Sequence, residues 1–175
     1  MKVKFLIPLL VLFAACNTVN VPLTDAQKEA VKGEAKEVVD VLINAMTENK
    51  LDLFLDLMEN SPDFTMSVAG EVYDFKGILE MIDQVSPMME RQTFETKFEQ
   101  YVVIDMNCFL YLWKGKNGVY MKSGESVVYD DYVFTYGFRK TEGSWKMFFG
   151  HESYLAPLPF DLDQDLDQDM DEDID

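Results

Sequence analysis

Residues that build metal sites and disulfide bonds are scarce in this chain. Its 175 residues include two cysteines, Cys16 and Cys108, and one histidine, His151. One histidine and one cysteine inside an apolar run do not make a zinc site, so we expect neither a metal nor another cofactor. If Cys16 is modified, Cys108 has no partner for an intrachain disulfide. The apolar stretch 106–113 around Cys108 favours a buried, inert thiol.

Positive charge is scarce as well. The chain has 15 lysines and arginines against 32 aspartates and glutamates, which gives a net charge of −17. Residues 1–15 carry +2, residues 16–160 carry −10 and residues 161–175 carry −9. An acidic body argues against a nucleic-acid partner and against adsorption to anionic lipid. Attachment to a membrane would therefore need something other than a basic surface.

An apolar run near the N-terminus, residues 5–15, is too short to cross a bilayer. Its 11 residues rise about 16 Å as a helix, against a hydrocarbon core of about 30 Å. Two lysines precede the run and two alanines end it, which is typical of a signal peptide.

The motif Phe13-Ala14-Ala15-Cys16 closes this run. It resembles the lipobox of bacterial lipoproteins, although leucine is usual where Phe13 stands. The resemblance implies that residues 1–15 are a lipoprotein signal peptide, that Cys16 is lipidated, and that residues 16–23 form a tether. It places the mature protein in the bacterial cell envelope, anchored by lipid to the membrane outside the cytoplasm. A plain secreted protein with an unmodified Cys16 is the alternative.

The C-terminal segment repeats with aspartate at every second position from Asp161 to Asp175. Counted from Asp161, several carboxylates and Glu172 fall at the ligand positions of an EF-hand loop. Leu166 stands where that loop needs glycine, and no helix follows. We therefore interpret residues 158–175 as an acidic disordered tail, with weak calcium binding as the alternative.

Residues 24–157 read as one α+β domain. Thr24 and Gln27 form a capping box, and apolar residues spaced by three and four up to Met46 predict a long amphipathic helix. A break at Asn49 separates it from a short helix over 51–59. Strands are predicted at 64–69 and 72–75. A third helix follows, which Gly77 opens and which covers 78 to about 89 with an interruption near Ser86-Pro87.

The remainder of the domain reads as an antiparallel meander. Strands are predicted at 93–104, 108–113, 119–139 with a break at 123–124, and 144–154, with turns at 114–118 and 142–143. The strand 108–113 is apolar on both faces, so both need cover. The helices can cover one face, and we expect a homodimer through the other. The alternative is a set of scattered surface aromatics.

Two stretches resemble the nuclear transport factor 2-like superfamily, which includes SnoaL-like cyclases and ketosteroid isomerase. Residues 42–52 are similar to its break between helices one and two. The stretch 138–147, followed by His151-Glu152-Ser153, is similar to its final hairpin. The resemblance covers about residues 24–155. It implies three N-terminal helices packed on a strongly curved, mostly antiparallel sheet, which together form a cone with a pocket.

Alternation along the last two strands supplies the candidate pocket residues. One row is Tyr132, Phe134, Tyr136 and Phe138, and the other is Trp145, Met147, Phe149, His151 and Ser153. The pocket candidates are Tyr73, Phe98, Tyr136, Phe149 and His151. His151 could transfer protons and Tyr136 could donate to an oxyanion, but each could instead be structural. Asp130-Asp131 could supply a carboxylate as general base, although the sequence favours a solvent-exposed turn at these two residues.

Two functions follow from these observations. The first is a non-catalytic envelope protein that binds a small apolar ligand or a partner protein in the cone. The second is a SnoaL-like cyclase or isomerase that uses His151 and Tyr136. Neither the Asp-Arg-Asp set of epoxide-hydrolysing relatives nor a tyrosine with two aspartates stands out in the sequence. The sequence therefore favours binding.

Overall fold

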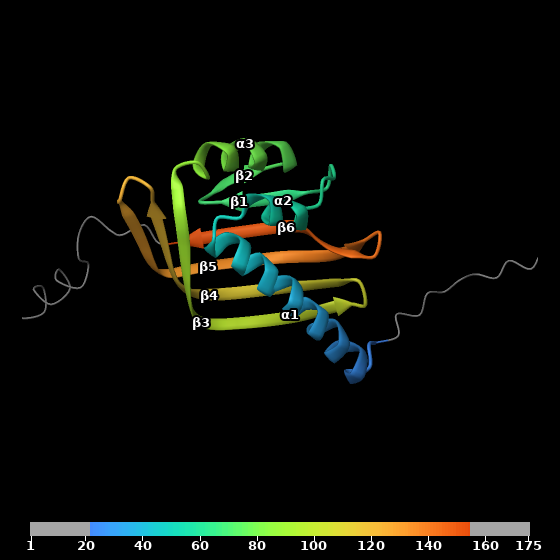
Figure 1. Ribbon diagram of the computed structural model, residues 1–175. Helices are drawn as coiled ribbons and strands as arrows, with labels where there is room; N and C mark the ends of the chain where they lie inside the picture. Colours follow the sequence, from blue (N-terminus) through green and yellow to red (C-terminus); the bar gives the residue numbers. More distant parts are fainter. Residues whose placement is uncertain (1–21, 155–175) are drawn as a thin grey trace, which may run out of the picture.

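The computed structural model describes residues 22–154, which form three helices over one six-stranded sheet (Figure 1). The helices are α1 (Asp25–Thr47), α2 (Leu51–Leu57) and α3 (Phe75–Val85). The strands are β1 (Thr65–Val68), β2 (Glu71–Tyr73), β3 (Met89–Asp105), β4 (Cys108–Met121), β5 (Ser126–Thr141) and β6 (Ser144–Tyr154). The strand order is β2-β1-β6-β5-β4-β3, with β1 and β6 parallel and the other pairs antiparallel. This confirms the predicted fold class. The signal peptide, nearly all of the tether and the acidic tail lie outside the described residues.

Helix α1 begins and packs as its sequence predicts. Thr24 accepts a hydrogen bond from the backbone N–H of Gln27, and the Gln27 side chain accepts one from the Thr24 N–H, which completes the capping box. The helix lies across the sheet on the side that faces the viewer in Figure 1. Its buried residues are Val31, Ala35, Val39, Leu42 and Ala45. These follow the spacing of three and four, so burial of one stripe holds the helix on the sheet.

The break after α1 is fixed by Asn49. This residue has a φ of 50°, in the left-handed region that asparagine tolerates better than most residues. Its side-chain amide donates to the backbone oxygens of Ser86 and Met89, at 3.0 and 2.9 Å. The predicted break is therefore confirmed, and it also ties the α1–α2 connection to the end of α3.

Helix α3 begins earlier than predicted. Asp74 is its N-cap and accepts a hydrogen bond from the Gly77 N–H at 2.7 Å. The prediction of a strand reaching residue 75 was wrong, because β2 ends at Tyr73 and Phe75 already belongs to the helix. The helix ends at Val85 with Ser86 as its C-cap, which confirms the predicted interruption near Ser86-Pro87.

Strand β4 is longer than predicted. The stretch 114–118 has the glycine and asparagine content of a turn, but it continues the strand without a break. Gly115 is required by packing, since a Cβ there would lie 2.1 Å from the Glu95 carbonyl oxygen. The chain turns at the predicted break, around Gly124, which has a φ of 91°. The predicted hairpin turn at 142–143 is confirmed, with both residues at positive φ.

The core is a set of aromatic side chains on the inner face of the sheet. From β4 these are Phe109, Tyr111 and Trp113, and from β5 they are Tyr132, Phe134, Tyr136 and Phe138. The Phe134 ring stacks on Trp113 at 5.0 Å and on Tyr136 at 4.6 Å between centroids. The row predicted to share one face of β5 does so, and the structure shows that this face is the inner one.

A β-bulge at Phe148 changes which residues of β6 face inward. Phe138 pairs with Met147 and Gly137 pairs with Phe149, which leaves Phe148 without a partner in the ladder. Side chains therefore point inward at Trp145 and Met147 before the bulge. After it, the inward positions are Gly150, Glu152 and Tyr154. The predicted single row through Phe149 and His151 was wrong beyond Met147, because strict alternation assumes a strand without a bulge.

Candidate functional site

A cavity of about 290 Å³ lies between the helices and the inner face of the sheet. Its wall combines all three helices with inward-facing residues of every strand except β2. The lining residues are Ala45, Met46, Asn49, Leu51, Phe54, Met66, Val68, Ile78, Met81, Ile82, Val85, Ser86, Met89, Gln92, Phe94, Asn117, Val119, Tyr129, Tyr132, Phe134, Tyr136, Glu152 and Tyr154. Most are aliphatic or aromatic, which is the usual composition of a small-molecule site.

Glu152 is the one carboxylic acid in this wall. It follows the bulge on β6 and pairs with Phe134 on β5, so Tyr132 and Tyr136 flank it two residues to either side of that partner. The Tyr132 hydroxyl donates to Oε2 and the Tyr136 hydroxyl donates to Oε1. Each carboxylate oxygen is therefore held by its own phenol, and the side chain has a fixed orientation.

Burial and hydrogen bonding act in opposite directions on Glu152. Removal from water raises the pKa of its carboxyl above the usual 4.5, and the two tyrosine hydrogen bonds oppose that rise. Burial, together with the nearby carboxylate, holds the pKa of Tyr132 and Tyr136 far above the usual value for a phenol. Both tyrosines thus remain protonated donors at any physiological pH.

The other polar groups of the wall already have partners. Asn117 donates to the Gln92 side chain at 3.4 Å and to the Thr93 carbonyl at 3.3 Å. The Ser86 hydroxyl donates to the Asn49 side chain at 3.1 Å. These bonds tie β4 to β3, and α3 to the α1–α2 break. They therefore support the wall. Glu152 differs from these groups because it is the one charged side chain among the lining residues.

Further aromatic rings surround the carboxylate end of the cavity. The Tyr154 ring stacks on Tyr132 at 5.5 Å and lies 4.4 Å from Tyr129, between centroids. Tyr132 and Tyr154 are cross-strand partners on β5 and β6. Glu152 is therefore placed beside a cluster of ring faces.

The predicted site residues are not brought together. Tyr136 lines the cavity and is fully buried. His151 is exposed on the outer face of the sheet, where its ladder partners are Thr135 and Ser67. Phe98 and Phe149 are 49% and 37% exposed and are not part of the cavity wall, and Tyr73 packs against the core outside it.

Sequence reasoning missed Glu152. His151 and Glu152 do point to opposite faces, as alternation requires, but the bulge turns Glu152 and not His151 inward. The spacing of Tyr132 and Tyr136 on β5 was an available signal. Two phenols four residues apart on one strand can both donate to a single acceptor that lies between them on the neighbouring strand. The pairing register that places Glu152 there is not visible in the sequence.

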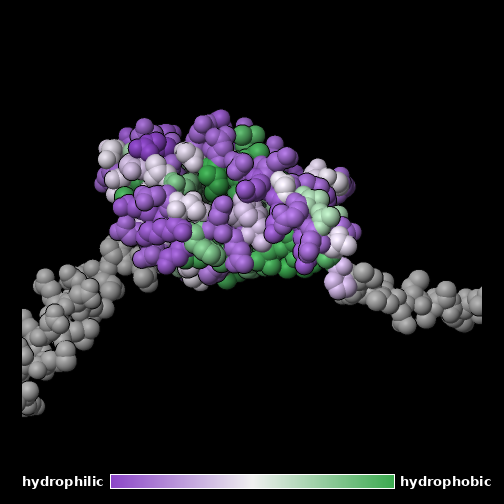
Figure 2. Space-filling view, turned by 90° about the horizontal axis from the view of Figure 1, so that it is seen from below, coloured by the Kyte–Doolittle hydropathy of each residue, from purple (hydrophilic) through white to green (hydrophobic). Residues whose placement is uncertain are grey.

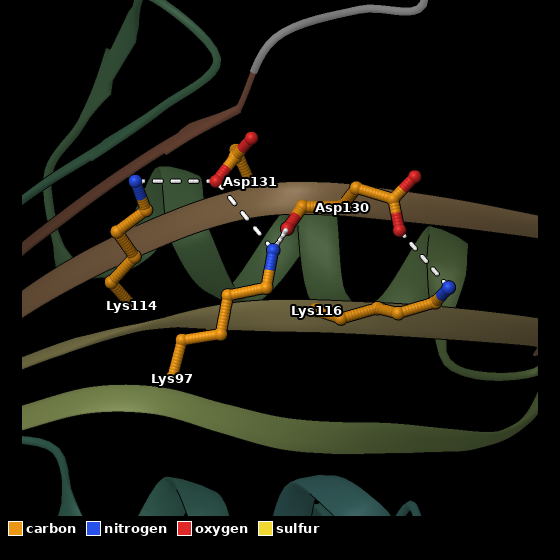
Figure 3. A network of polar contacts seen from close by, with 5 residues as sticks. All are labelled: Lys97, Lys114, Lys116, Asp130 and Asp131. Atoms are coloured by element: carbon orange, nitrogen blue, oxygen red, sulfur yellow. Dashed lines mark hydrogen bonds and ion pairs between the residues drawn. The ribbon is translucent and has the colours of Figure 1, made fainter.

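The outer face of the sheet carries charge in a different form. Lys97, Lys114 and Lys116 surround Asp130 and Asp131 in a network at the sheet surface (Figure 3). Lys116 contacts Asp130 at 3.0 Å, and Lys114 contacts Asp131 at 3.2 Å. The candidate base at Asp130-Asp131 therefore lies among exposed ion pairs and outside the cavity. Within residues 22–154, no three histidine, cysteine or acidic side chains are grouped so as to hold a metal ion.

Comparisons with known proteins identify the fold alone. No family model matches the chain, and no curated protein matches it. A candidate dehydratase of the nuclear transport factor 2-like family from Streptomyces avermitilis gives a TM-score of 0.63 at 16% identity, over 74% of this chain and 99% of that chain. A nuclear transport factor 2-like superfamily protein from Salmonella enterica gives a TM-score of 0.63 at 14% identity, over 75% of this chain and 95% of that chain. A type 2 hexachlorocyclohexane dehydrochlorinase gives a TM-score of 0.59 at 13% identity, over 79% of this chain and 97% of that chain. The chain therefore has the nuclear transport factor 2-like fold.

Proposed function

We propose that this protein is a lipid-anchored protein of the bacterial cell envelope whose cavity binds a small, largely apolar ligand. The observation that carries the proposal is the cavity itself, an apolar space of about 290 Å³ with one fixed carboxylate in its wall. A binding site needs shape and one or two oriented polar groups, and both are present. A partner protein would need a surface groove, whereas this space lies between the helices and the sheet.

Ligand binding is testable by NMR with simple probes. Toluene and 4-phenylbutan-1-ol are titrated into the labelled protein, and we expect shifts confined to residues of the cavity wall. Met81→Trp should fill the cavity and abolish these shifts. Met88→Trp is the matched control, because Met88 is 52% exposed and is not part of the wall. Absence of cavity shifts with every probe would contradict the proposal.

The anchor is tested separately. Cys16 is the proposed lipid site, so Cys16→Ala should abolish labelling with radioactive palmitate and release the protein from the membrane fraction. Cys108→Ala should leave both unchanged, because Cys108 lies in strand β4. Among residues 22–154 no helix is apolar over enough length to span a membrane. Membrane attachment that survives Cys16→Ala would contradict a lipid anchor.

An enzyme of the dehydratase or isomerase type is the second candidate, and one observation favours it. Glu152 is partly buried, lines the cavity and is oriented by two tyrosines, which are the attributes of a general base. Similar structures include a candidate dehydratase and a dehydrochlorinase, which remove water or hydrogen chloride from their substrates. In this version Glu152 takes the proton-transfer role predicted for His151, and Tyr136 positions it. Turnover of a bound β-hydroxy or β-chloro compound, lost in Glu152→Gln with binding retained, would favour the enzyme.

We also propose that the outer sheet face packs against a second copy of the chain. Exposed apolar side chains on this face include Phe98, Val102 and Phe149. Seen from the β3 side, most of the surface is hydrophilic, and hydrophobic residues gather along its lower margin (Figure 2). The lysine–aspartate network beside them carries both signs of charge, and a twofold dimer brings the same surface patch of both copies into contact.

Light scattering tests the dimer at micromolar concentration. Val102→Glu should raise the dimer dissociation constant at least tenfold, because it places a charge in the apolar interface. Val41→Glu is the matched control, since Val41 on α1 is 43% exposed against 38% for Val102. A wild-type protein that is purely monomeric would overturn the dimer.

A further inference from the structure

We propose that the cavity ligand is an organic cation, a protonated amine carried on an apolar body. The inference rests on the proposed ligand-binding function and names the chemistry of the ligand. It follows from three features of the cavity: the hydrogen-bonding capacity left at Glu152, the absence of a basic side chain in the wall, and the ring faces beside the carboxylate.

The hydrogen-bonding capacity left at the Glu152 end is that of acceptors. Each phenol uses its one O–H to donate to a carboxylate oxygen. Lone pairs remain on both carboxylate oxygens and on the two phenol oxygens, and no O–H or N–H of this group remains free. A ligand group that contacts the Glu152 carboxylate must therefore bring the donor. An ammonium group brings up to three.

Charge points the same way. The wall contains no lysine, arginine or histidine among the residues that the structure describes. Several cations of the sheet are paired elsewhere: Arg139 with Glu59 at 2.6 and 2.8 Å, and Lys97, Lys114 and Lys116 in the outer network. His151 projects from the opposite face. A buried carboxylate without a cation is costly, and an ammonium ligand supplies the missing charge. An anionic ligand would add a like charge.

The aromatic rings favour a cation over a neutral donor. Tyr129, Tyr132, Tyr154 and Phe134 line the same part of the cavity as Glu152. The electron-rich faces of such rings attract ammonium groups, and more strongly where water is excluded. An alcohol could donate one hydrogen bond to Glu152, but it would gain nothing from the rings and would leave the carboxylate charge uncompensated.

The rest of the cavity wall favours a ligand whose body is apolar. Helix α3 contributes Ile78, Met81, Ile82 and Val85, all apolar. Methionine side chains adapt to the shape of what they contact. The ligand class is therefore an alkyl or arylalkyl amine with its ammonium at Glu152 and its apolar end at α3.

Calorimetry on the purified protein at pH 7 tests this with a matched pair, 4-phenylbutylamine and 4-phenylbutan-1-ol. The wild-type protein should bind the amine at least tenfold more tightly than the alcohol. In Glu152→Gln the ratio should fall to about one, because the variant keeps the shape and removes the charge. Glu59→Gln is the control, since Glu59 bonds Arg139 outside the cavity, and it should keep the wild-type ratio.

Two outcomes would overturn the inference, and they differ from failure of the proposed function. Equal affinity for amine and alcohol, or an unchanged ratio in Glu152→Gln, would reject the cation and keep an apolar binding site. Failure of amine, alcohol and toluene alike would reject ligand binding itself. If Glu152→Gln does not fold, the pH series on the wild type decides. Amine affinity should fall as the pH is lowered and Glu152 is protonated, while alcohol affinity stays constant.

Discussion

The two faces of the sheet hold acidic side chains in opposite ways. On the inner face, Glu152 is partly buried and is held by two phenols without a cation in the cavity wall. On the outer face, Asp130 and Asp131 are 73% and 50% exposed and contact lysines (Figure 3). Ion pairs at a surface contribute little to stability, whereas a buried acid without a cation is costly to keep. The proposed ligand site therefore lies on the face where an acid is kept without a paired cation.

The largest effect is expected from removing a ring of the inner face. Phe134 is 1% exposed and lies between the rings of Trp113 and Tyr136. Phe134→Ala should lower the free energy of unfolding by about 3–5 kcal/mol, through lost burial and the cavity that remains. Phe149→Ala on the outer face should cost far less, since Phe149 is already 37% exposed. Urea denaturation measures both, and equal losses would contradict the assignment of the faces.

A smaller effect is expected from removing one hydroxyl at the carboxylate. Tyr136→Phe deletes the donor to Glu152 Oε1 and leaves that buried oxygen without its bond. The free energy of unfolding should fall by about 1–3 kcal/mol. Tyr73→Phe, outside the cavity wall, serves as the control and should stay close to wild type. No loss in Tyr136→Phe would mean that the bond to Glu152 is not stabilising.

The pH dependence of stability should depend on Glu152. Its pKa is raised in the folded state, so the folded protein binds the proton more tightly than the unfolded chain does. Between the usual carboxyl value of 4.5 and that raised pKa, wild-type stability should fall as the pH rises, by up to about 1.4 kcal/mol per pH unit. Glu152→Gln should lack this component. Denaturation curves across this range test it, and identical pH slopes in both proteins would contradict a raised pKa.

The smallest effect is expected on the outer face. The hydrogen bond from Lys114 and its charge hold the pKa of Asp131 below its usual range, which makes its contribution present at neutral pH and lost as the pH falls. Because solvent screens this exposed pair, Asp131→Asn should leave the melting temperature within measurement error of wild type. Calorimetry at low and high salt measures it. A large, salt-dependent loss would show that the network stabilises the domain.

The parts of the fold that local chemistry determines were predictable. The capping box at Thr24, the break at Asn49 and the turn at Gly143 each follow from residues adjacent in sequence. The start of α3 was missed although its cap is local, since Asp74 bonds the Gly77 N–H three residues on. The length of β4 was not predictable, because tertiary contacts override local preference there. Gly115 resembles a turn residue, but it stands in a strand because the Glu95 backbone approaches too closely for any side chain.

The candidate site was predictable only in part. Tyr136 was placed correctly because β5 alternates without interruption over residues 132–138. Glu152 was missed because its orientation depends on an unpaired residue at Phe148, and that bulge arises from pairing with β5 and from the contact of Phe148 with Arg139, at 4.9 Å. Both are properties of the assembled sheet, so strand β6 alone cannot reveal them.

The bulge at Phe148 also has a consequence for how such proteins diverge. Deleting one residue at the bulge would restore a regular ladder and leave Met147 and Glu152 facing inward. Inserting one residue between Phe149 and His151 would instead move His151 to the place that Glu152 now occupies. A single inserted codon would thus replace a carboxylate by an imidazole in the same cavity. Two descendants of one gene could then differ in the chemistry of the cavity without any amino-acid substitution.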